Sequence, residues 1–176
     1  EIVLPSMLGN CSTNHRGEWA MNIFVVDKNP VIAAQMLCDK HVVKMVLETA
    51  QMLCTVAHRH GYSKARYKKT HQHHPCTVWA GDSQSNYNWL TRHGLALCAE
   101  YTKRYEKRHK SQDIIEWCQR NVTIPDQGLT PFKMAMPDKY KQSNITEAYR
   151  NYYRGEKAKI AKWKHGSPRW WKEPKL

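Results

Sequence analysis

A carboxylate, a histidine and a lysine recur at helical spacing in the first half of the chain. His41, Lys44 and Glu48 stand three and four residues apart, so they share one face of a helix that Gln51 and Thr55 continue. Apolar residues fill most of the remaining positions of this helix, which is typical of a buried element. A carboxylate held in a partly apolar cleft can exchange protons near neutral pH. The pattern predicts either an acid–base site centred on Glu48 or an ordinary solvated helix face.

Three histidines and one cysteine lie between residues 71 and 76. These residue types are zinc ligands, but no second ligand pair follows at a familiar spacing. We therefore expect no metal and no cofactor. We expect instead that His71 and His74 contact phosphate, with Pro75 stiffening the turn before the next helix; zinc binding by this cluster is the alternative.

Aromatic and basic residues also gather near the end of the chain, where Arg169, Trp170, Trp171 and Lys172 follow one another. The tryptophans could cover the hydrophobic core. They could equally stack on nucleobases, because aromatic rings interleaved with cations suit that role.

The charge balance points to a polyanionic partner. The chain has 28 Lys and Arg against 15 Asp and Glu, a formal net charge of +13. Such an excess favours nucleic acid first and an anionic membrane surface second. The residues that we assign to nucleic-acid contact are Lys40, Lys44, His71, His74, Arg92, Lys103, Arg104, Arg169, Trp170, Trp171 and Lys172.

Several enzyme classes are excluded by missing motifs. The chain has no Gly-rich phosphate loop, no dinucleotide fingerprint, no Gly-x-Ser-x-Gly turn and no zinc-deaminase signature. No apolar run is long enough to cross a bilayer, and no signal-peptide pattern is present. The six cysteines form no Cys-x-x-Cys pair, which predicts free thiols in a reducing compartment. We expect a monomer in the cytoplasm, which is the host cytoplasm if the protein is viral.

The helix signals predict a mostly α fold, a compact single-domain bundle with long ordered loops. Asn29 and Pro30 mark the start of a helix that should run to about His58. Further helices are expected over 83–109, 111–120 and 145–164, with an ordered loop over 121–142. The run 22–26 is the one candidate for a short strand.

Residues 1–20 differ from the rest in having no periodicity. They are expected to be either an irregular N-terminal arm or a leader that the native protein lacks, in which case Met21 is the natural start. The domain is then expected to span 21–176.

Three segments, taken in order, resemble the pyrimidine-dimer DNA glycosylase family, the phage-type dimer-excising endonuclease V enzymes. The first places Asp39-Lys40-His41 seven residues before Glu48, and the second places His74-Pro75 before an aromatic-rich helix. The third is the C-terminal series Lys159-Ile160-Ala161, Pro168 and Trp170-Trp171-Lys172.

The resemblance implies a compact helical enzyme that binds double-stranded DNA, flips a base and forms an imine through its N-terminal amine. Glu48 would be the catalytic carboxylate, His41 a phosphate or sugar contact, and the amine of Met21 the nucleophile if the chain begins there. Trp170, Trp171 and Lys172 would face the lesion. The family's arginine before the glutamate is Leu47 here, and Lys44 could substitute for it.

The expected function is therefore a DNA glycosylase and AP lyase acting on damaged or modified pyrimidines. Two alternatives stay open: a modified-base DNA-processing enzyme on the same fold, and a non-catalytic basic DNA-binding protein.

Overall fold

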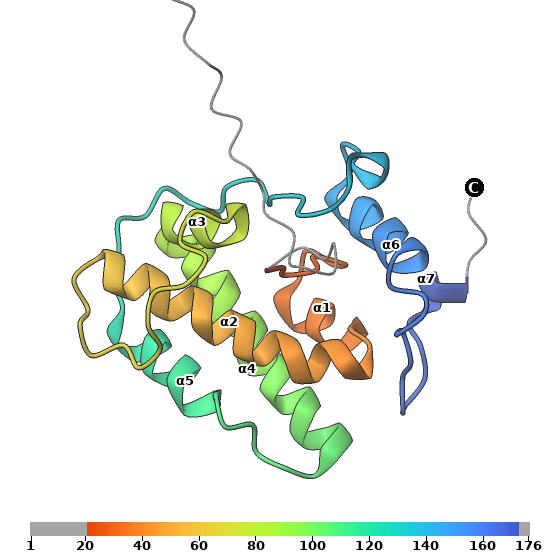
Figure 1. Ribbon diagram of the computed structural model, residues 1–176, viewed down its shortest axis with the longest axis horizontal. Coiled ribbons are helices and arrows are strands. Elements are labelled where there is room, and N and C mark those ends of the chain that lie inside the picture. The colour runs from red at the N-terminus through yellow and green to blue at the C-terminus, as the bar shows by residue number, and fades with distance from the viewer. Residues whose placement is uncertain (1–20, 173–176) are drawn as a thin grey trace, which may run out of the picture.

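The computed structural model describes residues 21–172, so the predicted arm at 1–20 lies outside the described residues. The described part is helical and contains no strand, which confirms the predicted mostly α, compact single-domain fold (Figure 1). The elements are α1 (Pro30–Met36), α2 (Asp39–Arg59), α3 (Pro75–Asp82), α4 (Gln84–Tyr105), α5 (Gln112–Asn121), the 3-10 turn η1 (Asp138–Tyr140), α6 (Ile145–Gly155) and α7 (Arg169–Lys172).

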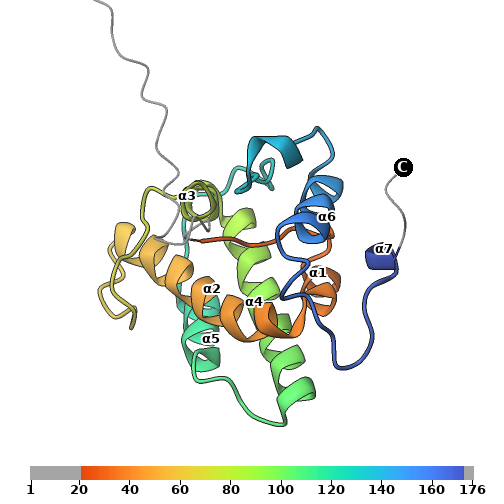
Figure 2. The ribbon, with the colours of Figure 1, turned by 45° about the vertical axis from the view of Figure 1, so that its right-hand side comes forward.

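The long helix α4 forms the centre of the fold. It packs against α1, α2, α3 and α5, and Figures 1 and 2 show it crossing behind α2. A Cβ atom built on Gly94 would lie 2.8 Å from Cγ2 of the buried Thr49, so glycine allows the two long helices to approach closely. No helix between residues 21 and 172 has the length and apolar character needed to cross a membrane.

The predicted helix from Pro30 to His58 is interrupted at Leu37 and Cys38. Both residues are extended, with ψ angles of 144° and 163°. The carbonyl of Leu37 accepts a hydrogen bond from Arg104, and the amide of Asp39 donates to the carbonyl of Lys162. Because these partners lie far along the chain, local periodicity could not reveal the break.

The prediction of a short strand at 22–26 is wrong, because the segment has no partner strand. Its residues are nevertheless buried, and several of its backbone groups bond to side chains. The Asn22 side chain accepts from the amides of Ile23 and Phe24, and Arg150 donates to the carbonyl of Val26. The segment is therefore a buried thread without regular secondary structure (Figure 2).

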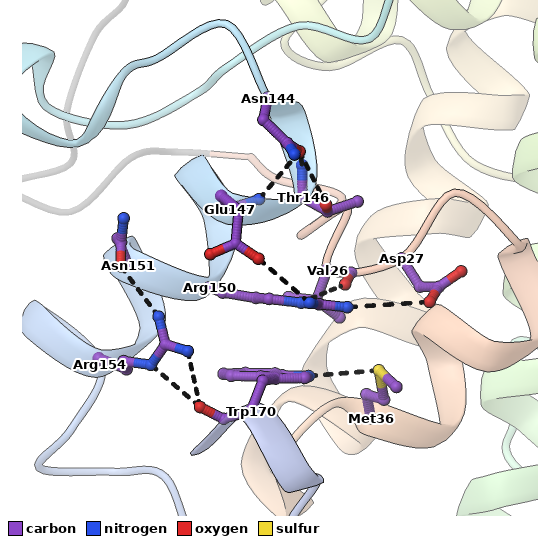
Figure 3. A network of polar contacts seen from close by, with 10 residues as sticks. All are labelled: Val26, Asp27, Met36, Asn144, Thr146, Glu147, Arg150, Asn151, Arg154 and Trp170. Atoms are coloured by element: carbon purple, nitrogen blue, oxygen red, sulfur yellow. Dashed lines mark hydrogen bonds and ion pairs between the residues drawn. The ribbon is translucent and has the colours of Figure 1, made fainter. Parts of the chain in front are cut away.

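The helix predicted over 145–164 ends early, at Gly155. The chain turns after Gly155 and docks onto the α1–α2 junction, where the Trp163 indole donates to the carbonyl of Met36. Trp170 on α7 then packs against α6, with Arg150 lying over its ring and Arg154 donating to its carbonyl (Figure 3). These long-range contacts stop α6 and carry the chain back across α1.

Candidate active site

A small pocket forms where the buried thread, α2 and the end of α6 meet. Three of the residues that line it belong to the polar face predicted on α2: His41, Lys44 and Glu48. The lining is completed by Asn22, Phe24, Met45, Tyr152 and Lys157.

The first wall of the pocket is the thread that follows Met21. Asn22 is buried, and its side-chain amide also donates to the carbonyl of Ala135 at 2.8 Å. Phe24 has a φ of 57°, a left-handed conformation that costs a non-glycine residue about 1–2 kcal/mol. This conformation accompanies a stacked contact between the Phe24 ring and the His41 imidazole, with centroids 4.3 Å apart. The strained residue thus shapes the pocket.

The second wall is the α2 face. The Lys44 ammonium lies 3.8 Å from Oε1 of Glu48, with the lysine side chain 54% exposed and the glutamate side chain 9% exposed. A lysine that precedes its glutamate by four residues is the weaker order for a helical ion pair, and an exposed partner weakens it further. The pair therefore contributes little to stability, and the Glu48 side chain lines the pocket.

The third wall comes from α6 and the turn after it. The Lys157 ammonium lies over the rings of Phe24 and Tyr152, 5.9 Å and 5.4 Å from their centroids. Sequence patterns did not identify Lys157, Tyr152, Asn22 or Phe24 as site residues. The one available signal was indirect: the run 22–26 is apolar and directly follows a candidate start at Met21.

The imidazole of His41 is 3% exposed and stays neutral. Burial, reinforced by the positive charges of Lys157 and Lys44, lowers the pKa of His41 from 6.5 to about 3. Burial also lowers the pKa values of His74 and His93 to about 4. All three side chains are therefore uncharged in the folded protein at neutral pH.

These three histidines should make the protein sensitive to acid. Their pKa is about 6.5 in the unfolded chain, so between pH 6.5 and 4 the unfolded state binds protons that the folded state does not. The free energy of unfolding should therefore fall as the pH decreases, by up to about 2 kcal/mol per histidine at pH 5. Urea titrations at pH 7, 6 and 5 measure how the free energy of unfolding changes with pH.

A matched pair of variants checks the origin of the acid effect. His93→Gln should reduce the pH dependence, since His93 is completely buried, whereas His73→Gln at an exposed position should leave it unchanged. Equal unfolding free energies at pH 7 and pH 5 for the unmodified protein would contradict the prediction.

The other residues predicted to contact nucleic acid do not line this pocket. Arg104 is buried and bonds to Glu100, Asp39 and backbone carbonyls, so its guanidinium faces protein groups. His74 is also buried, and its Nδ1 accepts from the amide of Cys76 as the cap of α3. Trp170 is buried as well, and its indole donates to the Met36 sulfur. These three side chains have structural partners that the sequence did not reveal.

The remaining predicted contacts lie at the surface. Trp171 is half-buried and packs on Trp163. Lys103 lines a separate basic groove with Lys107 and Lys164. The exposed residues are Lys40, Lys44, His71, Arg92, Lys103, Arg169 and Lys172.

The residues described by the structure include no group of three His, Cys, Asp or Glu close enough to hold a metal ion. Cys38, Cys54, Cys98 and Cys118 are buried with free thiols. The polar side chains that line the pocket carry a carboxylate, a neutral imidazole, an amide, a phenol and two ammonium groups.

No curated protein and no solved structure matches the chain. A family model described as pyrimidine dimer DNA glycosylase matches residues 21–113, more than half of the 176-residue chain. The match begins at Met21 and includes His41, Lys44 and Glu48, and it confirms the resemblance drawn from the sequence motifs. The chain therefore belongs to the pyrimidine dimer DNA glycosylase family.

Proposed function

We propose that this protein is a DNA repair glycosylase with AP lyase activity, which flips a damaged or modified pyrimidine out of duplex DNA and forms an imine with its sugar. Family membership supports DNA glycosylase activity at a general level. The observation that carries the finer proposal is the pocket itself, in which Glu48, His41 and Lys44 meet the thread that directly follows Met21.

The nucleophile in this proposal is the α-amine of Met21 in a chain that begins there. Asn22 lines the pocket, so that amine would lie one residue from the pocket wall. The Met21 side chain is buried, and both the oxygen and the nitrogen of the Asn22 side-chain amide are hydrogen-bonded. The start of the thread is therefore held in place. An α-amine has a pKa of about 8, so part of it is unprotonated at neutral pH.

Glu48 would accept and donate protons during the reaction. The amine nitrogen attacks C1′ of the sugar, and the pyrimidine leaves with the electrons of the glycosidic bond and takes up a proton. The bond from C1′ to O4′ then breaks, O4′ is protonated and the imine forms. Transfer of a C2′ proton to the Glu48 carboxylate would allow the 3′ phosphate to leave, which cuts the strand. A general acid or base of this kind contributes roughly 10²–10⁴-fold to rate.

The charge distribution supports binding of a polyanion around this pocket. Lys40 and Lys44 are exposed on α2, with Lys44 beside Glu48, and Lys157 also lines the pocket. Extrusion of a base costs a few kcal/mol, least at a damaged site. Phosphate neutralisation by a chain with a net charge of +13 can offset that cost, and the resulting affinity should fall with salt.

Borohydride trapping tests the proposed chemistry, because it reduces an enzyme–DNA imine to a stable amine. Two chains should be compared, one beginning at Met21 and one beginning at Glu1, on duplex DNA with a pyrimidine dimer. The Met21 chain should give a covalent adduct with the dimer duplex and none with the undamaged duplex. Acetylation of its α-amine should abolish the adduct.

The other outcomes favour the alternatives. An adduct with a different modified pyrimidine, and none with the dimer, would favour a modified-base enzyme. Tight DNA binding with neither adduct nor strand cleavage by either chain would favour a non-catalytic DNA-binding protein and would sink the proposal.

A further inference from the structure

The imidazole of His41 contacts two aromatic rings and one hydroxyl group. It is stacked on Phe24 on one side and meets the edge of the Tyr153 ring, with centroids 5.2 Å apart. The Tyr153 hydroxyl lies 2.6 Å from Nδ1 of His41. Tyr153 is completely buried and is not part of the pocket lining, so it stands behind the imidazole.

The direction of this hydrogen bond follows from the other partner of the hydroxyl. The backbone amide of Cys38 donates to the Tyr153 oxygen at 3.1 Å. The Cys38 thiol also interacts with this hydroxyl, but sulfur is a weak acceptor. Nδ1 of His41 lies 2.6 Å from the same oxygen and is the stronger acceptor, and a buried hydroxyl rarely leaves its proton unused. The Tyr153 hydroxyl therefore donates to Nδ1.

An imidazole that accepts at Nδ1 and is neutral carries its proton on Nε2. Burial together with Lys157 and Lys44 keeps His41 neutral, since they lower its pKa to about 3. The Nδ1 edge faces Tyr153 behind the pocket wall, so the Nε2 edge lies on the side of the pocket. His41 thus offers an N–H donor whose state does not change across the physiological pH range.

We propose that Tyr153 is a positioning residue that holds His41 as a neutral Nε2–H donor, aimed at a substrate oxygen that gains negative charge during the reaction. This proposal rests on the proposed glycosylase function. Two oxygens have the required chemistry: the carbonyl O2 of the departing pyrimidine and O4′ of the opening sugar ring. A preorganised neutral donor suits such an oxygen, because it stabilises charge that develops in the transition state.

A fixed phosphate would be a poorer ligand for this donor. Phosphate carries its charge throughout the reaction, and the ammonium groups of Lys44 and Lys157 line the same pocket. An uncharged donor close to two cations increases the reaction rate most when its acceptor oxygen is neutral in the bound substrate and becomes negative in the transition state. The hydrogen bond from Tyr153 should therefore affect the rate of reaction more than DNA affinity.

The main test is Tyr153→Phe, which keeps the aromatic ring and removes the hydroxyl. We expect the single-turnover rate on dimer-containing duplex to fall about 10–100-fold, the range for removing the hydrogen-bond partner that orients a metal-binding histidine. The dissociation constant for DNA should change less than twofold. Tyr87→Phe is the matched control: Tyr87 is equally buried and donates to the Leu53 carbonyl, away from the pocket lining, so its loss should leave the rate unchanged.

A duplex that already contains an abasic site separates the two oxygens. If His41 binds the departing pyrimidine, Tyr153→Phe should slow base removal but not cleavage at the abasic site. If it binds O4′, both reactions should slow. A Tyr153→Phe rate equal to that of Tyr87→Phe on both substrates would overturn the proposal.

Nitrogen-15 spectra of His41 provide a readout that needs no activity. In the unmodified protein Nδ1 should give the signal of an unprotonated nitrogen and Nε2 that of a protonated one. Tyr153→Phe should give a mixture of the two tautomers. Protonated Nδ1 in the unmodified protein overturns the inference even if the enzyme is active. If neither trapping nor cleavage is seen, the proposed function is contradicted. The spectra would still show which nitrogen of His41 carries the proton.

Two substitutions of His41 keep the proposal testable if Tyr153→Phe does not fold. The amide nitrogen of glutamine reaches roughly as far along the side chain as Nε2, and that of asparagine only as far as Nδ1. His41→Gln should therefore retain at least tenfold more activity than His41→Asn. Equal activities, or a faster asparagine variant, would refute an Nε2–H donor.

Discussion

Substitution of Glu48 by glutamine is expected to lower cleavage of dimer-containing DNA by at least about 10³-fold, within the range for removal of a general acid or base. Glutamine keeps the size of the side chain and its hydrogen-bonding capacity but cannot take a proton from C2′ or from the attacking amine. Single-turnover gel assays measure the rate, and fluorescence anisotropy measures the affinity for the same duplex.

The affinity should be retained, because loss of a carboxylate does not weaken attraction to phosphate. Folding should be little changed as well, since the pair between Lys44 and Glu48 has one exposed member and is worth about 0.5 kcal/mol or less. The control is Glu116→Gln on α5, which makes the same change of charge at a carboxylate that pairs with Arg108 outside the pocket. Turnover by Glu48→Gln at the rate of Glu116→Gln would show that Glu48 is not the catalytic carboxylate.

Substitution of Arg104 by alanine is expected to lower the free energy of unfolding by about 3–5 kcal/mol. The Arg104 side chain is 4% exposed, and its guanidinium bonds to the carboxylates of Glu100 and Asp39 at 3.0 Å and 3.2 Å. It also donates to the carbonyls of Leu37 and Gln35 at 2.7 Å and 3.0 Å. Alanine would leave these acceptors without a donor in the region where α1 passes into α2. Urea denaturation measures the loss.

The neighbouring Lys103 provides the control for Arg104, because it is exposed. Lys103→Ala should change the free energy of unfolding by no more than about 0.5 kcal/mol. If Lys103 contacts phosphate, its removal should also make the plot of log DNA affinity against log salt concentration less steep, by about one unit of slope. An Arg104→Ala variant of normal stability and reduced DNA affinity would contradict the structural assignment and restore the DNA contact predicted from the sequence.

The local parts of the fold could be predicted from sequence because they depend on neighbours along the chain. Asn29 caps α1 as expected, its side chain accepting from the amides of Val31 and Ile32. The fold class, the loop that precedes α6 and the ends of α2 and α5 agree with the predicted pattern to within about a turn. The shared face of His41, Lys44 and Glu48 follows from helical spacing alone.

The errors in the prediction have a common physical origin. The break at Leu37 depends on Arg104 and Lys162, and the early end of α6 depends on the docking of Trp163 against Met36. The DNA contact assigned to Arg104 stays a prediction. The sequence could not show that its guanidinium has buried partners, because Leu37, Asp39 and Gln35 lie far from it along the chain.

The sequence by itself determined a helical, basic chain with a polar face on α2 centred on Glu48, since propensity, charge and periodicity are properties of short segments. Only the tertiary structure decided what closes that face into a pocket. Phe24 and Lys157 come from opposite ends of the domain, and Tyr153 reaches His41 across 112 residues. Contacts at such separations leave no periodic trace, because they are made only when distant segments pack together.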